Sequence, residues 1–164
     1  LFDLTKSFQK KEIFLGKITD LKKFPKEFIS VEIRTNNITK DMIAFSAFGL
    51  IGVIDELLNN SVKIIPLHDS SIKVPAKNSR TLENIIIIGT GKSKTFQIEE
   101  FKKNGDIQKG DEIISSGLGG RFPEGFSLGR VTDIEENDQS NFLLVKVENT
   151  FDFSFGSTIL FTKP

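Results

Sequence analysis

Hydrophobic and polar residues alternate with a period of two along most of this sequence. In the segment Phe28–Arg34, branched aliphatic residues at every second position share one face, and the polar residues between them lie on the other. This pattern predicts a half-buried β-strand. Similar short runs follow at Met42–Ser46, Gly49–Ile54, Val62–Leu67, Ile72–Pro75, Asn84–Ile88, Glu112–Ser115, Ser127–Ile134, Phe142–Val147 and Thr158–Thr162.

Turn-forming residues separate most of these runs. Examples are Asn36-Asn37, Asn59-Asn60 and Lys109-Gly110-Asp111, because Asn, Asp and Gly adopt turn conformations readily. Short strands without long helices between them exclude a doubly wound nucleotide-binding sheet and predict an all-β fold. We expect two small β-barrel subdomains, since closure leaves no exposed sheet edges.

The predicted elements divide the chain into three parts. Apolar residues recur at helical spacing in residues 1–12, which predicts the C-terminal end of an α-helical coiled coil. The first barrel is expected over residues 13–66 and the second over 67–164. The last strand, Thr158–Thr162, would belong to the second barrel or return to the first.

Composition narrows the classes of protein. The 164 residues include 22 Lys+Arg and 22 Asp+Glu, so no excess of positive charge attracts nucleic acid or anionic lipid. Cysteine is absent, which excludes disulfides, thiolate metal sites and a cysteine nucleophile. No apolar run is long enough for a membrane helix. Because the sequence starts at Leu1, we expect a trimmed piece that has lost any membrane anchor with its N-terminal part.

A glycine-containing loop is the best enzymatic candidate. The predicted strand Asn84–Ile88 runs into Gly89-Thr90-Gly91-Lys92-Ser93, which is similar to the end of a phosphate-binding loop. The complete pattern needs a glycine five places before Gly91, where this chain has Ile86. The loop is therefore too short to wrap a phosphate, and a nucleotide-binding enzyme is a minor alternative.

No other catalytic or metal-binding set is complete. His68 is the only histidine, and the adjacent Asp69 is badly placed to bond its far ring nitrogen. The pair Ser115-Ser116 lacks the Gly-x-Ser-x-Gly elbow of a hydrolase. Asn104-Gly105-Asp106 reads as a hairpin turn, because the terminal Glu of a calcium loop is missing. We therefore predict a protein that is not an enzyme, with no catalytic, metal-binding or cofactor-binding residue.

Phenylalanine is the unusual component, with 16 residues and neither Trp nor Tyr. In Met42–Ile54, apolar residues fall on both faces of the predicted strands, so one face needs cover from the sister barrel or from another protein. A barrel that binds single-stranded nucleic acid would stack bases on such aromatics, but it would also need a basic groove. Nucleic-acid binding is therefore a second minor alternative.

The longest motif is Gly110–Val131, which reads GDEIISSGLGGRFPEGFSLGRV. It closely resembles the MreC family of bacterial cell-shape-determining proteins. That family carries Gly-Asp, two β-branched residues, Thr/Ser-Ser-Gly-Leu-Gly-Gly, Phe-Pro-x-Gly and a Gly-x-Val strand. With weaker matches at Ala47–Ile54 and Ile64–Asp69, the resemblance covers roughly residues 13–164.

The resemblance implies a non-enzymatic scaffold of the cell-elongation (rod) complex. Such a scaffold would bind a penicillin-binding transpeptidase, maintain cell shape and direct peptidoglycan synthesis. Its other partners would be further membrane components of that complex and other copies of itself, with no nucleic acid and no cofactor. The chain would be the periplasmic (extracytoplasmic) domain of a single-pass inner-membrane protein.

Two sets of residues are expected to matter for this function. Because a few aromatic anchors usually carry an interface, exposed phenylalanines of the first barrel are the candidates for partner binding, namely Phe24, Phe28, Phe45 and Phe48. The glycine-rich segment is expected to be structural and to form the corner between two strands, since glycine reaches positive φ at little steric cost. Its residues are Gly117, Leu118, Gly119, Gly120, Phe122, Pro123, Gly125 and Gly129.

Overall fold

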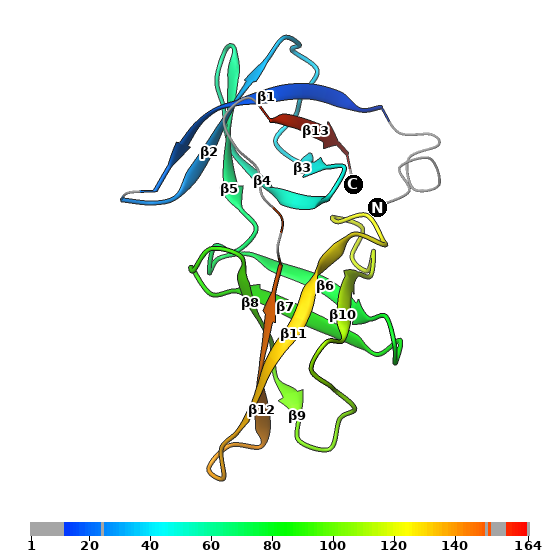
Figure 1. The fold of residues 1–164 in the computed structure, drawn as a ribbon. Helices are drawn as coiled ribbons and strands as arrows, with labels where there is room; N and C mark the ends of the chain where they lie inside the picture. Colours follow the sequence, from blue (N-terminus) through cyan, green and yellow to red (C-terminus); the bar gives the residue numbers. More distant parts are fainter. Residues whose placement is uncertain (1–11, 24, 150, 152–156, 164) are drawn as a thin grey trace. The chain divides into compact units, whose positions relative to one another are not determined.

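The computed structural model describes residues 12–23, 25–149, 151 and 157–163. Within these ranges the chain forms thirteen β-strands and no helix (Figure 1). The predicted end of a coiled coil over residues 1–12 lies outside the described residues, apart from Glu12. The strands are β1 (Phe14–Lys22), β2 (Phe28–Ile33), β3 (Ile43–Ser46), β4 (Gly49–Leu57), β5 (Ser61–Pro66), β6 (Lys73–Asn78), β7 (Asn84–Gly89), β8 (Thr95–Ile98), β9 (Phe101–Lys102), β10 (Glu112–Ser115), β11 (Ser127–Glu136), β12 (Phe142–Glu148) and β13 (Thr158–Thr162).

The first barrel is a closed antiparallel sheet with the strand order β1-β13-β3-β4-β5-β2. Alternation along its strands sends every second residue inward, as β2 shows with its buried Ile29, Val31 and Ile33. The inward residues form one core that excludes water from the barrel. Its buried members are Ile18, Ile29, Val31, Ile33, Ile38, Met42, Ala44, Ile51, Ile54, Val62, Ile64, Ile159 and Phe161.

The second barrel is also closed and antiparallel. Its strands follow the order β11-β10-β6-β7-β8-β12, and the pairing of β11 with β12 completes the ring. The two-residue strand β9 adds to β12 outside this ring. The all-β prediction with two small barrels is therefore confirmed, with six strands in each ring.

The C-terminal strand β13 belongs to the first barrel. It pairs with β1 on one side and with β3 on the other. The chain accordingly divides into two units. One contains the residues up to Leu67 and those from Phe151 onward, and the other is His68–Thr150. Of the two places expected for the last strand, the structure shows the return to the first barrel, so the second barrel does not extend to residue 164. The reason is tertiary: Ile159 and Phe161 fill the core of the first barrel.

Candidate partner-binding site

Two of the four candidate phenylalanines, Phe45 and Phe48, differ in their exposure to solvent, although they lie only three positions apart. Phe45 is 0% exposed on β3, and its neighbours Ile43 and Ala44 are fully buried too. Because neighbouring residues of a strand point to opposite faces, β3 is covered on both faces. The prediction of Phe45 as an exposed anchor is therefore wrong, and this side chain belongs to the packed interior.

Phe48, by contrast, lies in the turn between β3 and β4 and is 63% exposed. Its backbone N–H donates a hydrogen bond of 3.2 Å to the hydroxyl of Ser46, which fixes the turn. A surface hollow of about 310 Å³ lies beside the ring. This hollow, which we call the Phe48 hollow, is lined by Ser46, Ala47, Phe48, Ser157, Thr158, Ile159 and Leu160.

Phe28 is half-buried at the start of β2 and stands between two lysines. The ammonium nitrogen of Lys63 lies 5.0 Å from the ring centroid, and that of Lys26 lies 5.8 Å from it. Cations at this distance are attracted to the electron-rich ring face, which holds the aromatic side chain in place. The fourth candidate, Phe24, lies outside the described residues.

The glycine-rich segment connects β10 to β11 in the second barrel. The hydroxyl of Ser115 organises this connection: it donates to the carbonyl of Pro123 at 2.6 Å and accepts from the N–H of Phe126 at 2.9 Å. Phe122 and Phe126 are buried, whereas Leu118 at the turn is 53% exposed. Positive φ angles, which favour glycine, occur at Gly117, Gly119, Gly120, Gly125 and Gly129.

Within the glycine-rich segment, Gly129 combines a positive φ with a close backbone neighbour. Its φ is +141°, and a Cβ at this position would lie 2.4 Å from the carbonyl oxygen of Glu148 on the neighbouring strand β12. Real Cβ atoms do not approach a backbone oxygen so closely. The close pairing of β11 with β12 thus depends on the missing side chain.

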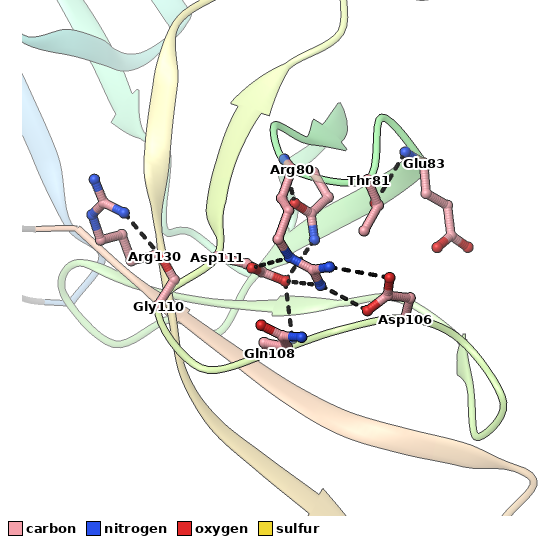
Figure 2. A network of polar contacts seen from close by, with 9 residues as sticks. Arg80, Thr81, Glu83, Asp106, Gln108, Gly110, Asp111 and Arg130 are labelled. Carbon is pink, nitrogen blue, oxygen red and sulfur yellow. Dashed lines mark hydrogen bonds and ion pairs between the residues drawn. The ribbon is translucent and has the colours of Figure 1, made fainter.

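A polar network that the sequence patterns did not reveal holds together the end of β6 and the start of β10. Figure 2 shows the Arg80 guanidinium between the carboxylates of Asp111 and Asp106. Arg80 Nε and Nη2 donate to the two oxygens of Asp111 at 2.8 and 3.0 Å. The Asn78 amide and the Gln108 backbone N–H add bonds of 2.8 and 2.9 Å to the same carboxylate.

The two carboxylates differ in their surroundings. The side chain of Asp111 is 5% exposed and accepts four hydrogen bonds, whereas that of Asp106 is 63% exposed and accepts two, both from Arg80. Hydrogen bonds from Arg80, opposed in part by burial, lower the pKa of Asp111 to about 2. The same guanidinium lowers the pKa of Asp106. The folded chain therefore stabilises the charged form of the Asp111 carboxylate.

The loop that resembles a phosphate-binding loop is a hairpin connection between β7 and β8. It bonds to its own backbone, since the N–H of Thr95 donates to the carbonyl of Lys92 at 3.1 Å. The N–H of Gly91 donates at 2.8 Å to the carbonyl of His68, whose side chain is buried. These two amide groups are therefore already bonded within the protein.

Two features are absent from the described ranges. They contain no group of three or more His, Cys, Asp and Glu side chains that could hold a metal ion. They also contain no helix with the length and hydrophobicity needed to cross a membrane.

Sequence comparison places the chain in a known family. The family model of the rod shape-determining protein MreC, barrel core, matches residues 33–162, which include the glycine-rich connection and the Asp111 network. The chain belongs to the MreC family. It is 31% identical over 100 residues to MreC of Haemophilus influenzae and 26% identical over 115 residues to MreC of Escherichia coli. These matches cover 61% and 70% of this chain, but only 28% and 31% of the relatives, so the chain spans about a third of their length.

Solved structures of MreC share this fold. The crystal structure from Pseudomonas aeruginosa has a TM-score of 0.83 at 22% identity, covering 92% of this chain and 98% of that one. A structure of the major periplasmic domain of "the cell shape-determining filament MreC" has a TM-score of 0.75 at 20% identity, covering 93% and 96%. The complex between penicillin-binding protein PBP2 and MreC from Helicobacter pylori has a TM-score of 0.69 at 18% identity, covering 93% and 98%.

Proposed function

We propose that this chain is a non-enzymatic scaffold domain that binds a penicillin-binding transpeptidase and so helps to maintain cell shape and direct peptidoglycan synthesis. The observation that carries the proposal is the similarity of its fold to an MreC that forms a complex with PBP2. Membership of the MreC family supports it. The internal hydrogen bonds of the loop between β7 and β8 and of Ser115 argue in the same direction, since they occupy the groups that a catalytic site would need.

We place the transpeptidase contact at the first barrel, around Phe48 and Phe28. Phe48 is a large apolar side chain held on a tight turn, and the Phe48 hollow beside it offers room for a partner side chain. Aromatic residues in such positions commonly contribute most of the binding energy of an interface. Phe28 adds an aromatic face flanked by the ammonium groups of Lys26 and Lys63.

The test is the affinity of this chain for the ectodomain of the transpeptidase from the same organism, measured by biolayer interferometry. Phe48→Ala should weaken binding by about 2 kcal/mol, which is about 30-fold in Kd. Its melting temperature should stay close to that of the native chain, because an exposed side chain contributes little to folding. The matched control is Phe142→Ala, which removes a partly exposed phenylalanine from the second barrel and should leave the Kd unchanged.

Three results would speak against this assignment. If the native chain does not bind the transpeptidase, the scaffold function itself is contradicted. If Phe142→Ala weakens binding and Phe48→Ala does not, the contact lies on the second barrel. If Phe48→Ala lowers the melting temperature strongly, the ring stabilises the fold and is no anchor.

We propose an extracytoplasmic location for this domain in a single-pass inner-membrane protein. The support is a relative of the same fold whose structure is described as the major periplasmic domain of MreC. That relative is a cell shape-determining filament, which also supports self-association of this chain. We further propose that Gly117, Gly119, Gly120, Gly125 and Gly129 serve folding and not recognition, because their backbone angles favour glycine.

A further inference from the structure

A second surface hollow of the first barrel is lined by charged side chains. It has a volume of about 310 Å³, and its lining comes from three neighbouring strands, β13, β1 and β2, and the residue after β2 (Figure 1). Sites for small molecules begin at about this size. We call it the charged hollow, and its lining residues are Leu15, Gly16, Lys17, Glu32, Arg34 and Thr158. It therefore combines two cations with one acid.

The strand register brings the charged groups of this hollow together. Lys17 on β1 is the direct partner of Glu32 on β2, and on its other side it is the partner of Thr158 on β13. Arg34 follows the end of β2, two residues after Glu32. Paired positions of an antiparallel sheet hold their side chains about 5 Å apart on one face. The closed barrel thus fixes the spacing of these groups through its backbone.

The charges of the hollow do not neutralise each other. Lys17, Glu32 and Arg34 are exposed, and none of them makes an ion pair or a side-chain hydrogen bond with another described residue. Elsewhere in the same barrel, the directly opposed residues Lys63 and Glu56 do form an ion pair, of 3.6 Å. The charged groups of the hollow are therefore available to a ligand.

The charged groups indicate the chemistry of the ligand. The guanidinium of Arg34 can bind a carboxylate through two parallel N–H groups, and the ammonium of Lys17 and the hydroxyl of Thr158 supply further donors. The carboxylate of Glu32 accepts hydrogen bonds from an ammonium group. A ligand of a single charge would leave one of these signs without a partner. The set is complementary to a molecule that carries both a carboxylate and an ammonium group.

We propose that the charged hollow binds a short zwitterionic peptide, with the carboxylate of the peptide at Arg34 and Lys17 and its ammonium group at Glu32. Leu15, another lining residue, is 60% exposed and offers an apolar contact to the small side chains between these two groups. Because the strands are fixed in a closed barrel, binding requires little reordering of the backbone.

The source of this peptide is inferred from the proposed function, and this step rests on it. The stem peptides of peptidoglycan are short and carry free carboxylate and amino groups. A domain that directs peptidoglycan synthesis would work beside them. We therefore assign a peptidoglycan stem peptide as the occupant, and its binding would keep the scaffold close to the wall that is being extended.

NMR titration of the native chain with synthetic peptides tests the proposal. The first peptide, Nα-acetyl-l-lysyl-d-alanyl-d-alanine, has a free side-chain amine and a free carboxylate. The second differs only in acetylation of that amine, and the third only in amidation of the carboxylate. The first peptide should shift the amide signals of Gly16, Lys17 and Glu32 in a saturable way. Each modified peptide should bind about tenfold more weakly, because one charged contact is lost.

Two substitutions link each charge of the peptide to one residue. Glu32→Gln should weaken binding of the first peptide about tenfold and leave binding of the acetylated peptide unchanged, since that peptide has no ammonium group to lose. Arg34→Ala should behave in the same way toward the first and the amidated peptides. The matched control is Arg121→Ala, which removes an exposed arginine from the second barrel and should change no Kd. All three variants should keep the native melting temperature, because these side chains are exposed.

Three results of the titration would overturn the proposal. The first is the absence of saturable shifts in the charged hollow. The second is that acetylation of the peptide and Glu32→Gln weaken binding independently, because the ammonium group would then lie elsewhere. The third is tighter binding of a peptide of the same sequence built only from l-residues, because the occupant would then be a segment of a protein.

The transpeptidase assay on the same variants separates this inference from the scaffold function. Arg34→Ala should bind the transpeptidase as well as the native chain does. If it loses affinity for the transpeptidase and none for the peptide, the hollow belongs to the protein interface and the proposal is overturned. A native chain that binds the peptide but not the transpeptidase would support the charged hollow and contradict the scaffold function.

Discussion

Removal of the Asp111 charge should weaken the second barrel in a pH-dependent way. In Asp111→Asn, the side chain keeps its size, but Arg80 loses its buried anion and the Asn78 amide faces another amide. A folded-state pKa of about 2, against an ordinary value of 3.8, corresponds to about 2 kcal/mol of stability at neutral pH. We therefore expect the variant to lose about 2 kcal/mol at pH 7.

The sign of the pH effect follows from the lowered pKa. Because the folded state holds the carboxylate ionised, the contribution of Asp111 is complete above about pH 4 and disappears as the pH falls through about 2. The native chain and Asp111→Asn should therefore differ at pH 5 and 7 and converge near pH 2. The assay is urea denaturation followed by circular dichroism at several pH values, with the transition of the second barrel fitted separately.

Asp106→Asn is the matched control for this experiment. It removes the other carboxylate bound to Arg80, but that side chain is 63% exposed, and solvent screens an ion pair at such a position. We expect little change in its stability at pH 7. The reasoning is refuted if Asp111→Asn and Asp106→Asn cost the same, or if the difference between the native chain and Asp111→Asn stays constant from pH 7 to 2.

Three further substitutions test other parts of the structure by thermal and urea denaturation. Phe45→Ala should cost about 3–5 kcal/mol because it empties a buried site, and a loss below about 1 kcal/mol would show that the site is not packed. Gly129→Ala should cost about 2 kcal/mol or more, because the new Cβ would meet the carbonyl oxygen of Glu148. Its control is Gly91→Ala, which should cost about 1 kcal/mol, because Gly91 also has a positive φ but has open space around it. Equal costs for the two substitutions would contradict the steric reasoning. Ser115→Ala should cost about 1–3 kcal/mol, since the N–H of Phe126 loses its acceptor. An unchanged urea midpoint would show that this hydrogen bond does not stabilise the connection.

Periodicity in the sequence was sufficient for the fold class, because a period of two marks a half-buried strand without further information. It did not identify β1 (Phe14–Lys22), β8 (Thr95–Ile98) or β9 (Phe101–Lys102) among the predicted strands. In β1 only Gly16 and Ile18 are buried, and the two residues of β9 are too few to show a period. The ring that receives β13 could not be read from the sequence alone. That choice depends on which edges remain unpaired in the folded chain.

The candidate site shows the same limit at the level of single residues. Phe45 and Phe48 occupy similar local sequences, but one is in a strand covered on both faces and the other is in the turn that follows. The Asp111 network was missed because its partners, Asn78 and Arg80, lie more than thirty positions away. The one signal that could have found it is the Gly-Asp at the start of the family motif, where an aspartate precedes a strand.

The position of β13 also determines how the chain would respond to mechanical tension. β1 and β13 are antiparallel neighbours, and Phe14 at the start of one pairs with Phe161 near the end of the other. A force that separates the two ends of the chain would therefore break the hydrogen bonds of this pair of strands one after another, starting at Phe14 and Phe161. The second barrel, inserted between β5 and β13, would bear load only after β13 had been peeled away.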